Sequence, residues 1–266
     1  MEPFLEEDSY HTQQNKPRYW LDRLSLNSRI YFILSFIGTV FRTRRVAMKG
    51  KYDKKAWIDS SHEIFRLIER CGGRFHITGL DYMREVKGPV VYISNHMSTL
   101  ETMIFPGIIA PFRDVTFVVK DSLVKHPFFG AVMRSRNPIV VSRSNSREDL
   151  MIVLNKGMEY LAKGISIVIF PQSTRNVIFN PSEFNSLGVK LAGRAGVPVV
   201  PVAIKTDFWE NGKIVKDLGP ISRDKPINIE FHSPLTVTGT GKDENQKIIE
   251  FISSRMNTWG GKVQSE

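Results

Sequence analysis

The sequence is poor in cysteine and has no apolar run long enough to cross a bilayer. Its 266 residues include one cysteine, Cys71, which excludes an internal disulfide framework and a cysteine-rich metal site. The main apolar stretch, 30–41, would span only about 18 Å as a helix, whereas the hydrocarbon core of a bilayer is about 30 Å thick. The polar opening residues show no secretory signal pattern. We expect residues 1–17 to be disordered.

Two common enzyme signatures are also missing. No Gly-x-Ser-x-Gly elbow is present, which makes a serine-nucleophile hydrolase improbable. No Gly-x-x-x-x-Gly-Lys-Ser/Thr motif is present either, which excludes phosphate-loop ATPase chemistry.

Basic residues outnumber acidic ones. The formal net charge is +10 and the isoelectric point is near 9.7, which favours anionic partners such as phospholipid surfaces, phosphorylated substrates or nucleic acid. The basic stretch near the N-terminus lacks the stacking aromatics of a nucleic-acid reader. We therefore expect no nucleic-acid partner.

The apolar stretch belongs to a segment, 18–45, that ends in cations. Further basic residues follow it closely, so that the group comprises Arg42, Arg44, Arg45, Lys49, Lys51, Lys54 and Lys55. This pattern is typical of a helix that lies in one leaflet, with its cations on anionic headgroups. We predict that 18–45 is a membrane-associating helical segment. A core helix of the main domain is the alternative.

Strand and helix patterns alternate over the rest of the chain. Short apolar runs predict strands at 74–78, 90–93, 115–119, 138–142, 165–170, 199–204 and 227–231. Helical patterns occupy 54–70, 148–162, 185–195 and 243–256. Strands without polar alternation are buried on both faces, so we predict an α/β fold: a single domain with a largely buried mixed sheet flanked by helices. We assign this catalytic domain to 46–258 and a flexible tail to 259–266.

A histidine and a carboxylate stand just behind one predicted strand. Asn95 and His96 follow the run 90–93, at the kind of position where α/β sheets place their chemistry. Ser98 and Glu101 have capping-box spacing, with Ser98 at a helix N-cap. Glu101 could then hold one imidazole nitrogen, leaving the other to accept a proton. The alternative is that Glu101 only caps the helix and His96 is a polar loop residue.

Three cations also stand at the ends of predicted strands: Lys120, Arg143 and Arg175. Arginine can hold a phosphate through a two-pronged pair of hydrogen bonds. The loop that carries Arg175 adds neutral hydrogen-bonding groups, Gln172, Ser173 and Thr174. Three cations at strand ends opposite a histidine favour an anionic substrate.

These motifs, in this order, resemble the glycerolipid acyltransferases that acylate lysophosphatidic acid and related lysophospholipids (PlsC-like). Asn95-His96 with Glu101 resembles the first block of that family, an Asn-His followed by an acid. Residues 138–143 are similar to the second block, 170–175 to the third and 197–202 to the fourth. Lys120 stands where the family carries a lysine.

The resemblance implies transfer of a fatty acyl group from acyl-CoA or acyl-carrier protein to a glycerol hydroxyl. The favoured acceptor is the lysophospholipid 1-acylglycerol-3-phosphate, in phospholipid biosynthesis. His96 would be the general base and Glu101 its orienting partner. Arg175, Lys120 and Arg143 would bind the acceptor phosphate. The acceptor and oxyanion loop would comprise Asn95, Gln172, Ser173 and Thr174.

The resemblance also implies the partners and the location of the protein. The acyl thioester is a co-substrate, and neither a cofactor nor a metal is expected. The partners would be a phospholipid surface, a lysophospholipid, the acyl thioester and, as a further candidate, acyl-carrier protein. We expect a monotopic or peripheral protein on the cytoplasmic face of the cell membrane.

Several positions depart from the family pattern. Glu101 replaces an aspartate, Gln172 and Ser173 replace Glu and Gly, and Asn137-Pro138 replaces the glycine that opens the second block. These changes leave the acceptor headgroup open. The alternative is a catalytically silent or differently specific lipid-binding member of the fold that acts on another hydroxylated lipid.

Overall fold

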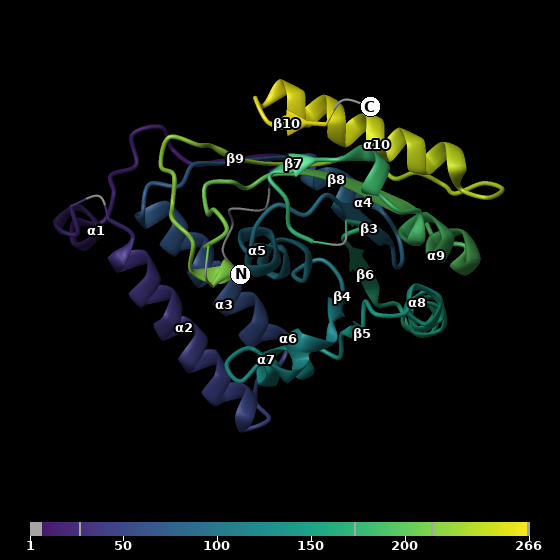
Figure 1. Cartoon of the computed structure of the whole chain (residues 1–266), viewed down its shortest axis with the longest axis horizontal. Coiled ribbons are helices and arrows are strands. Elements are labelled where there is room, and N and C mark those ends of the chain that lie inside the picture. The colour runs from purple at the N-terminus through teal and green to yellow at the C-terminus, as the bar shows by residue number, and fades with distance from the viewer. Residues whose placement is uncertain (1–6, 27, 173, 214, 265–266) are drawn as a thin grey trace.

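The computed structural model describes residues 7–26, 28–172, 174–213 and 215–264 of the chain. An eight-stranded mixed sheet forms its centre (Figure 1), with strand order β1-β2-β9-β8-β3-β6-β4-β5. These strands are β1 (Tyr10–His11), β2 (Phe75–Thr78), β3 (Val91–Ser94), β4 (Val115–Lys120), β5 (Ile139–Val141), β6 (Ser166–Ile169), β8 (Val199–Lys205) and β9 (Ile227–Phe231). The predicted α/β fold with a mixed sheet is confirmed.

The middle of the sheet is parallel. Strand β3 lies between β6 and β8, so that Tyr92 pairs with Val168 on one side and Val200 on the other. Strands β4 and β5 continue the parallel order beyond β6, whereas β9 runs antiparallel to β8. The carboxyl ends of β8, β3, β6, β4 and β5 therefore meet at one edge, and the loops that follow them lie close together.

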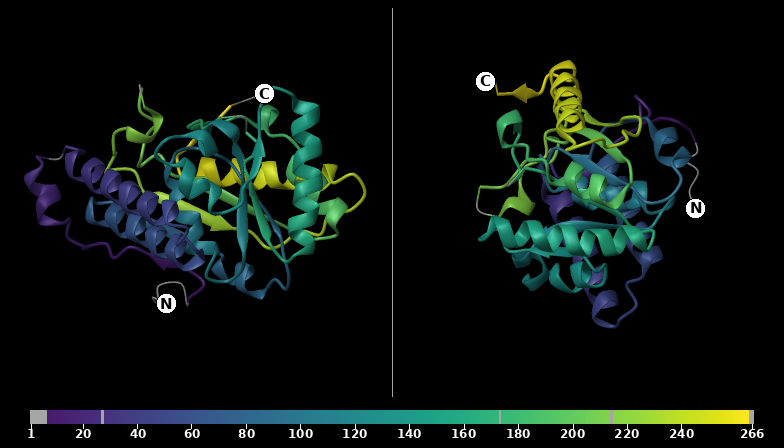
Figure 2. Two further views of the ribbon diagram at one scale, coloured as in Figure 1. Left: turned by 90° about the horizontal axis from the view of Figure 1, so that it is seen from below. Right: turned by 90° about the vertical axis from the view of Figure 1, so that its right-hand side faces the viewer.

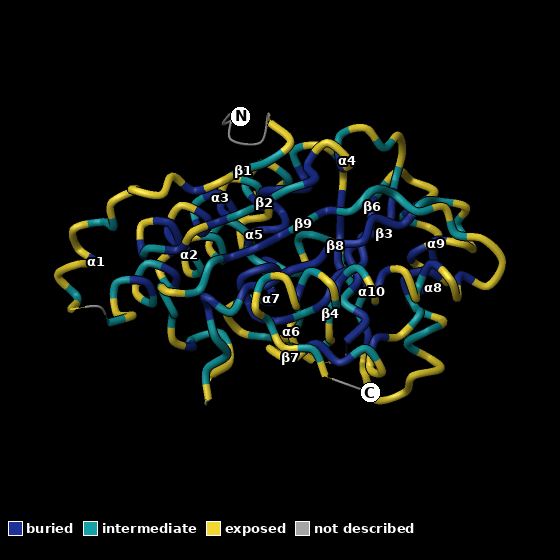
Figure 3. Tube along the Cα trace, turned by 90° about the horizontal axis from the view of Figure 1, so that it is seen from above, coloured by how far each residue is buried: buried dark blue, intermediate teal, exposed yellow. Residues whose placement is uncertain are grey.

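Helices cover both faces of the sheet. Helices α3 (Lys54–Arg70) and α5 (Leu100–Ile109) pack against each other on one face, and α2 (Ile30–Met48) lies outside α3 (Figure 2). Helices α8 (Ser146–Ala162), α9 (Leu187–Ala195) and α10 (Lys242–Thr258) cover the other face. Figure 3 shows that the buried residues concentrate along the central strands. The shorter elements are α1 (Trp20–Leu24), α4 (Leu80–Glu85), α6 (Asp121–Lys125), α7 (Gly130–Arg134), β7 (Ile178–Phe179), η2 (Pro181–Glu183), η3 (Lys216–Leu218) and β10 (Lys262–Val263).

Helix α2 has one buried face and one exposed face. Phe32 and Phe36 are buried, and each meets the ring of Trp209 edge-on with centroids 4.8 Å apart. On the opposite face, Ile30 and Leu34 are 60% and 65% exposed. The buried face fits the alternative of a core helix, and membrane association of the exposed face stays a prediction. Within the described ranges, no helix is both long enough and apolar enough to span a membrane.

The ends of the chain are more ordered than expected. Residues 10–11 form β1, which pairs antiparallel with β2, and Thr12 is buried, where its Oγ1 donates to Glu69 Oε1 over 2.7 Å. The expected disorder of 1–17 is therefore wrong for this stretch, because a buried carboxylate satisfies its polar groups. The expected flexible tail 259–266 is wrong for residues 262–263, which pair with β7 as strand β10. Residues 1–6 and 265–266 lie outside the described part of the chain.

Candidate active site

The loop after β3 brings His96 onto Glu101. The Nδ1 atom of His96 lies 2.8 Å from Oε1 of Glu101, in the first turn of α5. Ser98 Oγ accepts a hydrogen bond from Leu100 N, and Ser98 N donates to Glu101 Oε1. The bond from Ser98 N to Glu101 is one of the two bonds of the predicted capping box. Ser98 Oγ binds Leu100 N instead of Glu101 N, and Thr99 rather than Ser98 directly precedes the helix. The same carboxylate thus caps the helix and holds the imidazole.

Glu101 is completely buried and fully hydrogen-bonded. Its Oε1 also accepts from Met97 N over 2.7 Å, and its Oε2 accepts from Thr206 Oγ1 over 2.7 Å. Burial alone would raise the pKa of Glu101, but hydrogen bonds from His96, Thr206 and Ser98 outweigh burial and hold that pKa below its ordinary value. An ionised carboxylate only accepts hydrogen bonds. His96 Nδ1 is therefore the donor in this hydrogen bond, and in a neutral imidazole Nε2 then has the free lone pair.

The loop after β6 fixes His96 from the other side. The imidazole stacks on Phe170, with ring centroids 4.3 Å apart. The backbone N–H of His96 donates to Gln172 Oε1 over 2.8 Å, and its carbonyl accepts from Asn176 N over 3.0 Å. The ring and the backbone of His96 are both held before any substrate arrives.

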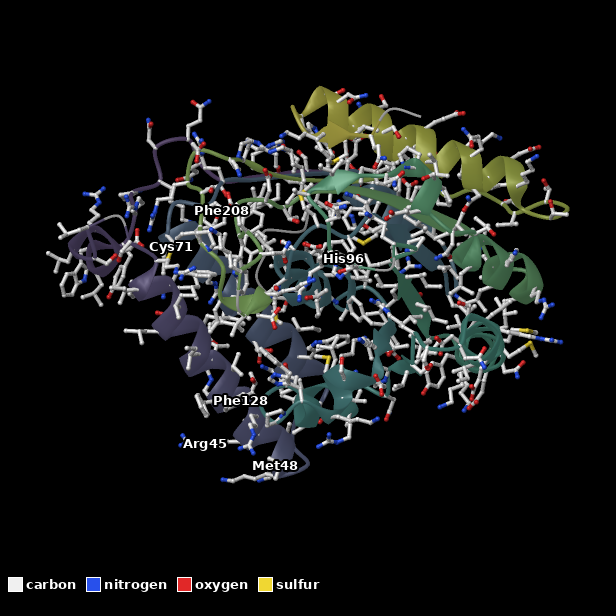
Figure 4. All side chains as sticks on the ribbon, viewed as in Figure 1. Arg45, Met48, Cys71, His96, Phe128 and Phe208 are labelled. Carbon is white, nitrogen blue, oxygen red and sulfur yellow. The ribbon has the colours of Figure 1, made fainter. Side chains whose placement is uncertain are left out.

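His96 lines a cavity of about 540 Å³. Figure 4 shows that His96 lies in the middle of the molecule. The cavity is lined by both cationic and apolar side chains. Its cationic residues are Lys120, Arg136, Arg143, Arg175 and Lys216, and its apolar residues include Trp57, Met103, Phe117, Phe129 and Met133. The three cations expected from the sequence are thus brought to one cavity with the histidine.

Two residues of the expected acceptor loop are placed elsewhere. Asn95 is buried, and its side-chain amide makes two 2.9 Å hydrogen bonds to the backbone of Ile204 in β8. Gln172 is buried beneath His96, as described above. Neither residue lines the cavity. The Asn95 side chain binds β8 and the Gln172 side chain binds the backbone of His96. Thr174 does line the cavity, whereas Ser173 lies outside the described residues.

Asp217 is a cavity residue that the sequence did not reveal. It belongs to the short turn η3, between β8 and β9, and its Oδ1 lies 2.7 Å from Arg175 Nη1. Thr99 Oγ1 donates to the same carboxylate oxygen over 2.7 Å and accepts from Arg175. On the same turn, Lys216 Nζ donates to Thr174 Oγ1 over 3.3 Å. No predicted strand end or motif lies at this turn in the sequence. Asp217 is therefore recognised as a cavity residue only from the structure.

The described part of the chain contains no cluster of three or more His, Cys, Asp or Glu side chains that could hold a metal ion.

Comparison with known proteins shows which sequences this chain resembles. A family model described as Acyltransferase matches residues 74–205. A 1-acyl-sn-glycerol-3-phosphate acyltransferase of Pseudomonas aeruginosa is 34% identical over 197 residues, which cover 74% of this chain and 71% of that protein. The Escherichia coli enzyme of the same name is 27% identical over 172 residues, 65% of this chain and 67% of that protein.

The overall fold also has a solved counterpart. The crystal structure of the 1-acyl-sn-glycerophosphate acyltransferase PlsC from Thermotoga maritima aligns with a TM-score of 0.65 and 18% identity. The alignment covers 92% of this chain and 98% of that one. The likeness therefore extends well beyond the sheet, to nearly the whole chain.

Proposed function

Because this chain belongs to the acyltransferase family, we propose that it is a 1-acyl-sn-glycerol-3-phosphate acyltransferase of phospholipid synthesis. It transfers a fatty acyl group from acyl-CoA or acyl-carrier protein to the free hydroxyl of the lysophospholipid. One observation carries the proposal. The nitrogen of His96 that is not held by Glu101 belongs to a ring that lines a cavity together with both cationic and apolar side chains.

The first step is removal of the acceptor's hydroxyl proton. His96 Nε2 takes this proton while the hydroxyl oxygen attacks the thioester carbonyl carbon, and general-base catalysis of this kind contributes about 10²- to 10⁴-fold. The ionised Glu101 stabilises the imidazolium that results. As the tetrahedral intermediate collapses, the C–S bond breaks and the imidazolium returns its proton to the thiolate. The products are an ester and a free thiol.

The cationic side chains of the cavity suit the acceptor's phosphate. Arg175, Lys120 and Arg143 line the cavity together with His96, so a phosphate bound by them would hold the acceptor within the same cavity as the base. Thr174 offers a neutral hydroxyl donor near the developing oxyanion. We expect Arg175→Ala to raise the KM for a phosphorylated acceptor strongly and to leave the acyl-donor KM nearly unchanged. Equal effects on both constants would contradict a phosphate role.

The apolar side chains of the cavity suit a hydrocarbon chain. They include Trp57, Met103 and Phe117. Burial of methylene groups against such side chains contributes about 0.8 kcal/mol per CH₂. The fatty acyl chain can therefore be held within the protein while its carbonyl lies near His96.

An exposed apolar surface supports a peripheral membrane location. It comprises Trp20, Leu24, Ile30, Leu34 and Phe41 of the N-terminal helices, together with Phe128 after α6. Phe41 and Phe128 meet edge-on with centroids 5.5 Å apart, and Arg44 Nε donates to Pro127 O over 2.9 Å. Figure 4 shows Arg45, Met48 and Phe128 at one edge of the molecule. We place this apolar surface on the cytoplasmic leaflet, with its cations at anionic headgroups.

This membrane assignment is tested in the full chain, because Phe32 and Phe36 make α2 part of the core. The triple change Leu24→Asp, Ile30→Asp and Leu34→Asp should release the protein from anionic liposomes in a sedimentation assay. The matched control is Met151→Asp with Met158→Asp, two exposed apolar residues on α8, and it should still sediment. If the triple variant also sediments, the membrane contacts lie elsewhere.

Activity is tested with pure protein, labelled acyl-CoA and a panel of lysolipids, with products identified by mass spectrometry. We expect a diacylated phosphate product from the wild type and none from His96→Ala. A His96→Ala variant that acylates at the wild-type rate would refute the base assignment. Binding of lysolipid by the wild type without any ester product would identify a catalytically silent lipid-binding protein instead.

A further inference from the structure

One oxygen of Asp217 joins two segments of the active site. Its Oδ1 accepts hydrogen bonds from Thr99 Oγ1 and from Arg175 Nη1, each over 2.7 Å. Thr99 directly precedes α5, the helix that carries Glu101, and Arg175 stands in the loop after β6. Asp217 itself comes from a third segment, the turn η3. The carboxylate thus links the catalytic helix to the phosphate-binding arginine.

The contact uses only one end of the Arg175 guanidinium. Among the described residues, the hydrogen bonds of Arg175 run from Nη1 to Thr99 and Asp217. A guanidinium has five N–H donors in a rigid fork, so the donors on Nε and Nη2 remain for a two-pronged pair with phosphate. The Arg175 side chain is 19% exposed and lines the cavity. Its anchored end therefore determines where its remaining donors point.

We infer that Asp217 is a positioning residue for acceptor recognition: it holds Arg175 in the orientation that receives the acceptor's phosphate. The inference rests on the proposed function and adds a residue to it. Without the carboxylate, the arginine side chain would have to lose its rotamer freedom when the phosphate binds, and this cost would weaken acceptor binding. The proposed function assigns this pair to the acceptor's phosphate, so we expect the effect to be selective for the acceptor KM.

A purely electrostatic role for Asp217 predicts the opposite sign. Among the described residues that line the cavity, one is acidic, Asp217, and five are cationic. If its main effect were to repel the phosphate or to occupy Arg175, removing it would tighten acceptor binding. The direction of the change in acceptor KM therefore separates positioning from competition.

The first experiment compares Asp217→Ala and Asp217→Asn with the wild type in the full chain. Loss of a hydrogen bond to a charged group should raise the KM for 1-acylglycerol-3-phosphate about tenfold in the Ala variant. The kcat and the acyl-CoA KM should stay within about twofold. Asn keeps a side-chain oxygen that can accept a hydrogen bond. The KM of Asp217→Asn for 1-acylglycerol-3-phosphate should therefore lie between the values of the wild type and Asp217→Ala. An unchanged or lowered acceptor KM in the Ala variant would overturn the inference.

A double-mutant cycle tests whether Asp217 acts through Arg175. Adding Asp217→Ala to Arg175→Ala should raise the acceptor KM no further, because the group that it positions is gone. A second, independent increase would contradict the inference. The control is Asp224→Ala, an exposed acid in the same β8–β9 connection, which should leave both KM values unchanged.

A binding measurement separates this inference from the proposed function. Calorimetric titration of the same variants with 1-acylglycerol-3-phosphate needs no turnover. If the wild type binds the acceptor but forms no ester, the proposed function fails, and the loss of affinity in Asp217→Ala still tests the positioning role. If Asp217→Ala binds as tightly as the wild type, the positioning role fails whatever the activity.

Discussion

The imidazole of His96 lies nearly flat on the phenyl ring of Phe170, with 20° between the two ring planes. His96 follows β3 and Phe170 follows β6, so the stack joins two neighbouring strand ends. Glu101 holds the ring at Nδ1 and Phe170 supports its face. Together they limit the ring to one orientation toward the cavity.

We expect Phe170→Leu to lower kcat about tenfold while the acceptor KM changes little, because a loosely held base departs from its productive geometry. Steady-state kinetics at saturating acyl-CoA measures this change. Phe117→Leu is the control, since Phe117 also stacks on Phe170 but its removal keeps the stack on His96. Equal losses of kcat in both variants would assign the effect to the cavity wall instead.

Glu101→Gln should lower kcat about 100-fold or more with little change in KM, because the negative charge acts on the imidazolium formed in the transition state. The matched control is Glu69→Gln, a buried carboxylate that binds Tyr10, Thr12 and Lys16 far along the chain. That control should lose stability and keep its kcat. A Glu101→Gln enzyme with wild-type kcat would refute the role of the carboxylate.

The lowered pKa of Glu101 predicts a loss of stability in acid. Its pKa lies below the ordinary value in the folded protein. At a pH between the folded and the unfolded pKa, the unfolded chain therefore binds the proton more readily. The stabilisation is therefore present at neutral pH and is lost as pH falls below about 4. Urea unfolding between about pH 5 and pH 3 should show a decreasing midpoint, with a smaller decrease for Glu101→Gln. Equal slopes would mean that other carboxylates control acid unfolding.

A buried ion cluster fastens α1 to the domain. Asp22 is completely buried and accepts from Arg18 Nε over 2.6 Å and from Arg223 Nη2 over 2.9 Å. Asp22→Asn should reduce the free energy of unfolding by about 2–3 kcal/mol, because it removes the buried charge that two partly exposed arginines bind. Asp59→Asn removes an exposed partner of Lys55 and should cost at most about 1 kcal/mol. Urea midpoints measure both changes, and equal effects would contradict the structural role of the cluster.

The sequence predicted best what depends on neighbouring residues. The helix predicted at 54–70 coincides with α3, because its apolar spacing and its cap at Asp53 are local. His96 lies in the loop after β3 and Glu101 in the helix turn that follows, so their spacing in the sequence was enough to pair them. The cations at the strand ends could also be grouped, since parallel strands end at a common edge.

The sequence could not predict what depends on strand order or on the path of a loop. The amide of Asn95 binds β8, and that contact follows only from the position of β8 beside β3. Asp217 reaches Arg175 from a connection whose course no local pattern specifies. Strand β1 has little apolar content, and Thr12 is held by Glu69, a residue distant in sequence.

A close approach between α9 and β3 makes the position of His96 depend on residues outside the cavity. A Cβ atom at Gly188 would lie 2.6 Å from Cδ1 of Ile93, and one at Gly157 of α8 would lie 2.7 Å from the side chain of Leu191. Ile93 stands three positions before His96, so crowding in this stack would displace the strand from behind. Distal substitutions on the far face of the sheet can therefore slow turnover without touching lipid, thioester or any reacting atom.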